Sequence, residues 1–336
     1  MKMKSVWIGL AAVAAVIAAV MFFSGGIAEK GDVRQGVPLA VGTNIWPGYE
    51  PLYLARELGY YDGKGVRLIE FASATQVLHA FRNKVIAAAA LTLDEVLLLK
   101  DYGLDPRVVL VFDTSDGADV ILSKREFSDM KALKGKRIGV ENTALGAFML
   151  MRALQLNGMQ LSDVEIVSLP INEHDTAFKT GKVDALVTFD PVRSRLMAEG
   201  YHELFTSKDI PDEVVDVLVV SEESLLSHNK ELNALFSGWF RGLDYLDDYP
   251  EKAAGIMAAR QKISTAELLE AYKGLHLPDL DENISMMDPP PSPLYLTATR
   301  MSELMYKSKL LKSRLNLKQM IAVEPLKQFK QGDAQR

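Results

Sequence analysis

The most constraining feature of this sequence is a regular alternation between short apolar runs and longer amphipathic runs. Seven runs follow one another from Val37 and read in turn as strand and helix: "VPLAVGT", "EPLYLARELGYY", "VRLIEFA", "ATQVLHAFRNK", "VIAAAALT", "LDEVLLLKDYG" and "VVLVFDT". Strands that alternate with helical runs of this length predict a parallel sheet covered by helices. The expected fold class is therefore α/β.

The same alternation starts again after Lys124, with the runs "KGKRIGVEN", "TALGAFMLMRALQLNG", "VEIVSLP", "EHDTAFKTGK" and "VDALVTF". These runs predict a second α/β unit of similar construction. The β-branched runs "ADVILSK" and "VVDVLVVSEE" flank this unit, and we expect them to form a two-stranded hinge. The predicted organisation is a discontinuous first lobe (37–122 plus 217–330, mostly helical after Asn229) and a second lobe (123–216).

Residues 1–28 have the pattern of an export signal. Lys2 and Lys4 precede an uncharged run from Val6 to Phe23, and small residues up to Ala28 offer a cleavage site. The run also approaches the length of a membrane span, so an uncleaved N-terminal anchor is the alternative. In either case the folded body is expected to be periplasmic, either free or held at the inner membrane.

Composition excludes several classes of site. The chain has no cysteine, so disulfides, thiolate chemistry and cysteine zinc sites are excluded. Its formal charge is −6, and loss of Lys2 and Lys4 with the signal would leave −8. An acidic body with no basic stripe is not expected to bind nucleic acid or anionic lipid.

In doubly wound sheets the ligand site lies beyond the carboxyl ends of the strands. The first such end carries Asn44 and Trp46, followed by Pro47 and Gly48. This tight turn could hold the Trp46 ring toward a flat or cationic group. The alternative is that Trp46 plugs the core as a large apolar side chain.

The next three strand ends add hydroxyls and carboxylates. Ser73 follows the second strand, Thr92 and Asp94 follow the third, and Asp116 and Gly117 precede the hinge. Each is a candidate for ligand contact. Helix capping accounts equally for Ser73, Thr92 and Asp94, and a simple turn accounts for Asp116 and Gly117.

The second lobe contributes Glu141, Thr143 and Ala144 at the start of a helix, and Asp190 before Pro191. A helix start with small residues exposes amide groups that suit an anion or a carbonyl oxygen. Asp190 is a ligand candidate at the cleft, or an N-cap of the following helix.

These residues predict the character of the ligand. One Trp, several hydroxyls and several carboxylates favour a ligand with a positive or donor-rich group, while the helix start at Thr143 could hold an acceptor. A bare inorganic anion is not expected, because no Lys or Arg lies at a predicted strand end.

Catalytic chemistry has little support in the sequence. The five histidines are scattered, and no phosphate-binding loop or nucleophile motif occurs. Cleft acids could form a general acid/base pair, but caps and turns account for the same residues. We therefore expect a binding protein with no catalytic residues, no metal and no cofactor.

Three stretches in order carry a specific resemblance: "IWPGYEPLYLARELGYYDGKGV", "LKGKRIGVENTALGAFMLMRAL" and "DTAFKTGKVDALVTFDPV". They resemble the extracytoplasmic solute-binding proteins of nitrate/sulfonate/taurine-type ABC importers, also grouped as the thiamine-pyrimidine-precursor-like family. The resemblance implies a type II periplasmic binding-protein fold and ligand contacts at Asn44, Trp46, Ser73, Thr92, Asp116, Gly117, Thr143, Ala144 and Asp190. The cysteine-rich motif of the family's enzyme branch is absent.

The expected function is capture of a small organic molecule that carries an amine, a sulfonate or a heterocycle. The resemblance implies delivery to the permease and ATPase of an ABC importer, and a monomer is expected. Two alternatives stay open, namely a ligand-sensing subunit of a membrane receptor and an enzyme on the same fold.

Overall fold

The computed structural model describes residues 37–141 and 144–333. The predicted signal or anchor at 1–28 and the candidate Thr143 lie outside the described residues. Within these two ranges, no helix is both long and apolar enough to cross a membrane.

Six strands form the first sheet, in the order β11, β4, β10, β3, β1 and β2. Their bounds are β1 Leu39–Thr43, β2 Val66–Glu70, β3 Ala88–Thr92, β4 Pro106–Ser115, β10 Val215–Ser221 and β11 Leu275–His276. β1 is parallel to β2 and β3, as the alternation predicts, whereas β10 is antiparallel to both β3 and β4. The carboxyl ends of β1 and β3 therefore lie at the same edge of the sheet.

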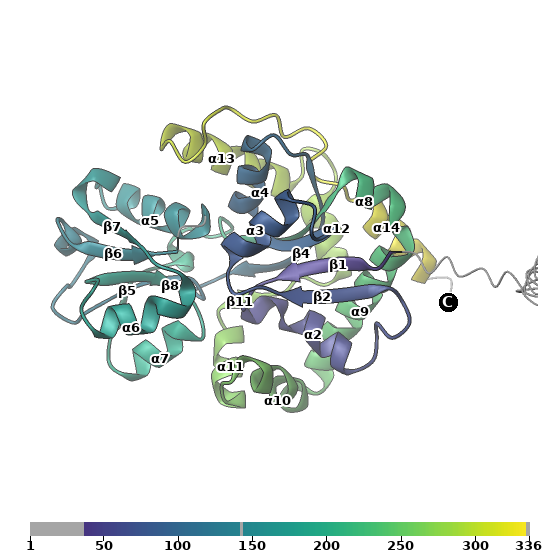
Figure 1. Cartoon of the computed structure of the whole chain (residues 1–336), viewed down its shortest axis with the longest axis horizontal. Coiled ribbons are helices and arrows are strands. Elements are labelled where there is room, and N and C mark those ends of the chain that lie inside the picture. Colours follow the sequence, from purple (N-terminus) through teal and green to yellow (C-terminus); the bar gives the residue numbers. More distant parts are fainter. Residues whose placement is uncertain (1–36, 142–143, 334–336) are drawn as a thin grey trace, which may run out of the picture. The chain divides into compact units, whose positions relative to one another are not determined.

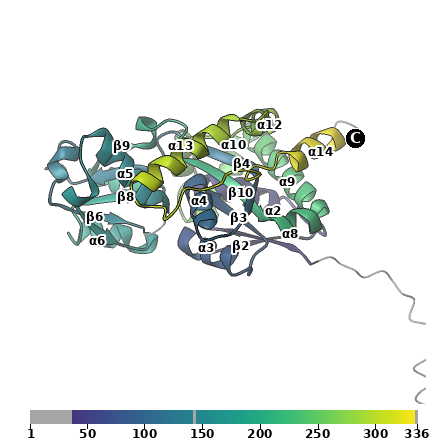
Figure 2. The ribbon, with the colours of Figure 1, turned by 90° about the horizontal axis from the view of Figure 1, so that it is seen from above.

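Helices cover both faces of this sheet. They are α2 Glu50–Glu57, α3 Ala74–Arg82, α4 Leu93–Asp101, α8 Glu222–Ser227, α9 Asn229–Asp248, α10 Pro250–Gln261, α11 Thr265–Tyr272, α12 Leu280–Met287, α13 Pro293–Lys307 and α14 Glu324–Asp333. Figure 1 shows α3 and α4 on one face and α2 and α9 on the other. α13 packs on α4 (Figure 2). Strands β1, β3 and β4 are buried along their whole length, as expected for strands covered on both faces.

Five strands form the second sheet, in the order β7, β6, β8, β5 and β9. The bounds are β5 Val120–Ser123, β6 Arg137–Val140, β7 Glu165–Ser168, β8 Ala185–Thr188 and β9 His202–Thr206, with helices α5 Ala144–Leu156, α6 His174–Lys179 and α7 Val192–Ala198. β6 is parallel to β7 and β8, and β5 is antiparallel to β8 and β9. The two sheets confirm the predicted two-lobed α/β fold (Figure 1).

The chain crosses between the sheets twice, but the crossings differ from the predicted hinge strands. Val120–Ser123 is an interior strand of the second sheet and Val215–Ser221 is an interior strand of the first, so these two segments do not pair with each other. The crossing residues are 116–119 and 207–214, a few residues before the predicted boundaries at 122/123 and 216/217. A β-branched run reads alike in a hinge and in a sheet interior, which explains the displacement.

Hydrogen bonds join the two crossings. The Ser207 hydroxyl lies 2.8 Å from the Ser115 hydroxyl and accepts the Gly117 amide at 2.6 Å. Gly117 has a φ of +106°, which favours glycine. A Cβ at this position would also approach the Lys208 side chain to 2.8 Å. The crossings therefore form one hydrogen-bonded unit beside the edge where β4 ends.

Candidate functional site

A cavity of about 40 Å³ lies between elements of the two lobes. The first lobe and the crossing contribute Asn44, Trp46, Tyr49, Ala74, Thr92, Glu95, Asp119 and Asp216. The second lobe contributes Glu141, Leu145, Gly146, Met149, His174, Val187, Thr188 and Phe189. The cavity therefore lies where the carboxyl ends of β1, β3, β6 and β8 meet, the position expected for a ligand site in this class of sheet.

The Trp46 turn forms one wall of the cavity. Pro47 begins the short helix η1 (Pro47–Tyr49), and the Trp46 indole Nε1 donates to Asp113 Oδ2 at 3.2 Å. Gly48 makes this geometry possible, because a Cβ there would lie 1.9 Å from Asp113 Oδ2. Trp46 is only 4% exposed, and its ring meets Phe189 of the second lobe edge-on at 5.4 Å. Trp46 thus lines the cavity and is also buried.

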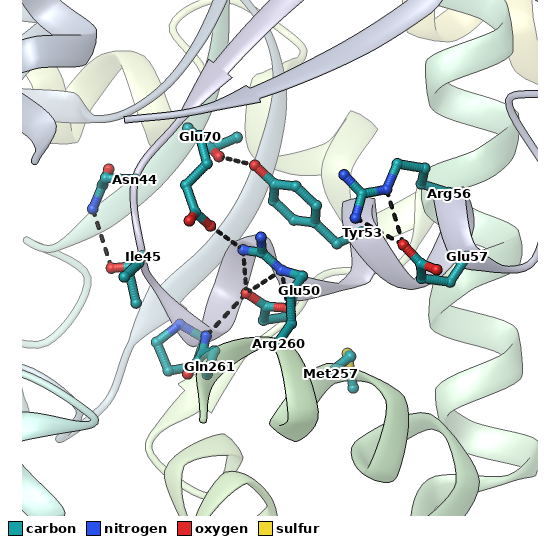
Figure 3. A network of polar contacts seen from close by, with 12 residues as sticks. Asn44, Ile45, Glu50, Tyr53, Arg56, Glu57, Glu70, Met257, Arg260 and Gln261 are labelled. Atoms are coloured by element: carbon teal, nitrogen blue, oxygen red, sulfur yellow. Dashed lines mark hydrogen bonds and ion pairs between the residues drawn. The ribbon is translucent and has the colours of Figure 1, made fainter. Parts of the chain in front are cut away.

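A polar network fixes the helix that follows this turn (Figure 3). Glu50, at the start of α2, is fully buried and accepts three bonds from the Arg260 guanidinium at 2.8, 2.9 and 3.2 Å. Gln261 donates to the same carboxylate at 3.1 Å, and Arg260 also pairs with Glu70. Burial raises the Glu50 pKa, and Arg260 opposes this shift. The network ties α10 to the chain segment that carries Trp46.

Acidic side chains of the first lobe form the floor of the cavity. Asp216 of β10 lies opposite Thr92 of β3 and opposite Asp113 of β4 in the sheet register. The Tyr49 hydroxyl donates to Asp216, and the Thr92 amide donates to Glu95 Oε2 at 3.0 Å. The sheet and the start of α4 thus place several carboxyls side by side.

The crossing and the second lobe add Asp119 and Glu141, both buried. Asp119 directly precedes β5, and Glu141 directly follows β6. His174 also lines the cavity, but burial lowers its pKa to about 4, so the imidazole is neutral near pH 7. None of the described lining residues is Lys or Arg.

Several of these carboxyls have an oxygen without a hydrogen-bond partner. Four of these oxygens belong to residues that line the cavity: Glu95 Oε1, Asp119 Oδ2, Glu141 Oε1 and Asp216 Oδ2. Two more belong to buried acids that do not line it: Asp94 Oδ2 and Asp113 Oδ1. A buried polar atom without a partner loses its full solvation energy, so such atoms are rare in folded proteins. The cavity is therefore built to receive hydrogen-bond donors.

The pKa values of these buried carboxyls are raised, as expected for acids that lack hydrogen-bond donors. Burial raises the pKa of Asp94, Asp119 and Glu141 to about 7 and that of Asp113 to about 8. Burial, followed by neighbouring carboxyls, also raises the pKa of Glu95 and Asp216 well above the ordinary range. These carboxyls hold protons at a pH where exposed acids are ionised, and a nearby cation would favour their ionised form.

Four predicted site residues line the cavity: Asn44, Trp46, Thr92 and Glu141. Ser73 caps α3, and Asp94 is buried beside Glu95. Asp116 is exposed, and neither it nor Gly117 is among the lining residues. The backbone of Ala144 begins α5.

Asp190 directly precedes Pro191, which is the N-cap residue of α7, so the predicted N-cap role of Asp190 is wrong by one residue. Asp190 accepts the backbone amide and hydroxyl of Ser194 and pairs with Arg193 at 3.4 Å. Arg193 is also held by Glu203 at 2.7 Å. Asp190 and Arg193 thus stabilise α7, outside the residues that line the cavity.

Sequence reasoning missed Tyr49, Glu95, Asp119 and Asp216 as site residues. Asp119 and Asp216 lie in runs interpreted as hinge strands, so their position at the cavity was not considered. A signal was available: Asp216 interrupts the apolar strand "VVDVLVV", as Asp113 interrupts "VVLVFDT". A charged residue inside a buried strand is costly, so it marks a candidate site. In the described part of the chain, no three acidic or histidine residues are grouped as metal ligands.

Comparison with known proteins identifies relatives. A family model described as the NMT1-like family matches residues 34–261. A Brucella abortus (strain 2308) protein named as a binding protein is 27% identical over 165 residues, which cover 48% of this chain and 52% of that protein. The chain thus spans about half the length of this relative. A Bacillus subtilis (strain 168) protein named for aliphatic sulfonates is 26% identical over 248 residues, covering 65% of this chain and 74% of that protein.

Solved structures share the fold at low sequence identity. The alkanesulfonate-binding protein of Xanthomonas axonopodis pv. citri, bound to MOPS, has a TM-score of 0.73 at 17% identity, covering 86% of this chain and 99% of that one. The periplasmic nitrate-binding protein of Synechocystis PCC 6803 has a TM-score of 0.71 at 12% identity, covering 89% of each chain. A desulfurization enzyme has a TM-score of 0.64 at 17% identity, covering 88% and 99%. Because the family model matches more than half of its length, the chain belongs to the NMT1-like family, and it has the two-lobed fold of the nitrate- and sulfonate-type periplasmic binding proteins.

Proposed function

We propose that this protein is an exported solute-binding protein that captures a small organic molecule bearing a protonated amine. The ligand binds in the cavity between the lobes and is delivered to an ABC importer. The names of the relatives support a binding role, and the fold of the periplasmic neighbours supports export.

The choice of an amine as the ligand rests on one observation, the unpartnered carboxyl oxygens in the cavity. Glu95, Asp119, Glu141 and Asp216 line one cavity, each is buried, and each has a carboxyl oxygen without a partner. Lys and Arg are both absent from the described lining. An ammonium group supplies donors and a charge of the opposite sign, which together stabilise buried carboxylates.

A simple sulfonate suits this cavity poorly. Two of the similar proteins are named for sulfonates and a third for nitrate, and all of these ligands are anions. The carboxyls that line the cavity repel an anion whenever they are ionised, and none of the described lining residues is a Lys or Arg that could balance its charge. We therefore propose that the acids of this chain select a different ligand class on the same fold.

Closure of the lobes supplies the binding mechanism. Trp46 of the first lobe meets Phe189 of the second edge-on, and residues of both lobes line the cavity. A ligand that contacts both lobes binds the closed arrangement better than an open one and so shifts the population toward closure. Because the enclosed volume is only about 40 Å³, a ligand of several heavy atoms requires the walls to move apart.

A thermal-shift screen of the purified protein against amines, sulfonates, amino acids and pyrimidines tests the ligand class. An amine at 100 times its Kd should stabilise the protein by about 2.7 kcal/mol. Glu95→Gln should weaken the shift, whereas Glu126→Gln should not, because Glu126 is exposed and lies away from the cavity. If all the hits are sulfonates or inorganic anions, the proposal is wrong.

Delivery to an importer is tested separately, by ligand-dependent ATPase activity of any permease and ATPase encoded beside this protein, reconstituted in vesicles. Stimulation only by the ligand-loaded protein supports transport. Absence of such genes, together with binding to a membrane receptor, would favour the sensing alternative. Chemical conversion of the bound amine during a long incubation would favour an enzyme.

A further inference from the structure

The number of unpartnered carboxyl oxygens in the cavity constrains how many donor groups the ligand carries. Four such atoms belong to lining residues: Glu95 Oε1, Asp119 Oδ2, Glu141 Oε1 and Asp216 Oδ2. Their residues are only 1%, 2%, 7% and 2% exposed, so bulk water does not satisfy them. One ammonium group has three N–H donors. A single ammonium therefore leaves at least one of these oxygens without a donor.

The carboxyls also come from different parts of the fold. Glu95 lies in the first turn of α4 and Asp216 in β10, both in the first lobe. Asp119 lies in a crossing, and Glu141 follows β6 of the second lobe. One compact cation close to the floor of the first lobe would leave the Glu141 side of the cavity without a donor.

The charges lead to the same requirement. Among the described residues, Arg193 pairs with the buried Asp190 and the half-buried Glu203, and Arg260 pairs with the buried Glu50 and the exposed Glu70. Neither arginine lines the cavity, and His174 is neutral near pH 7. Burial raises the Asp119 pKa to about 7 even though the Arg193 charge opposes the shift. One monocation would neutralise one of four lining carboxyls, and the others would remain protonated or repel one another.

We propose that the ligand is a short diamine or polyamine, with one ammonium bound by Glu95 and Asp216 on the first lobe and a second bound by Glu141 on the second lobe. This inference rests on the proposed function and makes it more specific. Since each ammonium binds a different lobe, the second charge also links ligand recognition to lobe closure.

The chain between the two nitrogens is short. The Glu141 charge contributes to the raised pKa of Glu95, and the Glu95 charge contributes to that of Asp216, so the three carboxyls lie within electrostatic reach of one another. Trp46, Tyr49 and Phe189 supply aromatic surface beside them, which suits the methylene chain and the cationic ends of such a ligand.

Calorimetric titration with 1,4-diaminobutane and n-butylamine tests the inference, because these probes differ only by the second amine. We expect a Kd about 10- to 100-fold lower for the diamine, from hydrogen bonds to charged groups. Butylguanidine carries five donors but one charge. It should bind more weakly than the diamine, and equal binding would overturn the requirement for two charges.

Variants locate the second amine. Glu141→Gln should raise the Kd for the diamine while changing that for butylamine little, and Glu126→Gln should change neither. Thermal unfolding of each variant checks that it is folded. Equal affinity of butylamine and the diamine would overturn the inference and leave the proposed function intact. An unchanged diamine preference in Glu141→Gln would overturn the role of Glu141. Failure of every amine to bind would instead overturn the proposed function.

Discussion

Asp113 and Asp216 lie opposite each other on the adjacent antiparallel strands β4 and β10, and both are buried. Each has a single neutral donor, the Trp46 indole for Asp113 and the Tyr49 hydroxyl for Asp216. Two buried carboxyls this close are difficult to ionise together without a cation. The proton content of the cavity therefore depends on whether a cation is bound.

Binding of a cationic ligand should release protons. Burial raises the pKa of Asp119 and Glu141 to about 7 and that of Asp113 to about 8, and an ammonium nearby favours the ionised forms. Affinity for 1,4-diaminobutane should rise between about pH 6 and pH 8. Calorimetry in buffers of different ionisation enthalpy measures the released protons. Asp113→Asn should reduce the number, and a buffer-independent enthalpy would contradict the prediction.

Without ligand, the buried acids should make the protein lose stability as pH rises from about 4 to 7, against the opposite contribution of one group, His174, whose pKa burial lowers to about 4. An acid whose pKa is raised by folding binds more protons in the native state than in the unfolded chain, so the free energy of unfolding falls with pH in the interval between the two pKa values. For Asp119 this interval runs from the ordinary value of 3.8 to about 7. The slope is at most about 1.4 kcal/mol per pH unit for one group.

Urea denaturation at pH 5, 6 and 7 measures this slope. Asp119→Asn should make the dependence shallower, whereas Asp212→Asn, at an exposed position in the second crossing, should leave it unchanged. Stability that rises over this range would show that the cavity acids are ionised in the free protein.

The sequence predicts the cavity residues that follow strand ends, but not the acidic residues that form the floor of the cavity. The order of strands and helices places Trp46 and Glu141 at strand ends, and both line the cavity. Asp216 and Asp113 become neighbours only through the register of β10 against β4, which joins segments far apart in the chain. No local pattern specifies that pairing, since β propensity depends on the neighbouring strands. The two predicted hinge strands were wrong for the same reason, because each of them pairs inside one of the sheets.

The ion pair between Arg260 and Glu50 should be essential to stability (Figure 3). Arg260→Met leaves the fully buried Glu50 carboxylate with only Gln261 as a donor, and we expect a loss of about 3–5 kcal/mol. The double variant Arg260→Met with Glu50→Gln should recover much of this loss, because no unpaired charge remains. Chemical denaturation measures both. Additive losses in the double variant would contradict this account.

Trp46 should report ligand binding through its fluorescence. It lines the cavity and contacts Phe189 across the lobes, whereas Trp239 is fully buried against Phe112 in the core of the first lobe. Ligand-driven movement of the lobes changes the surroundings of Trp46 and leaves those of Trp239 constant. Trp46→Phe, which keeps an aromatic ring of smaller volume, should therefore abolish the fluorescence change on addition of 1,4-diaminobutane. Trp239→Phe should preserve the fluorescence change. If Trp239→Phe abolishes the change and Trp46→Phe does not, the tryptophan that responds to ligand is Trp239 in the core, and the prediction is wrong.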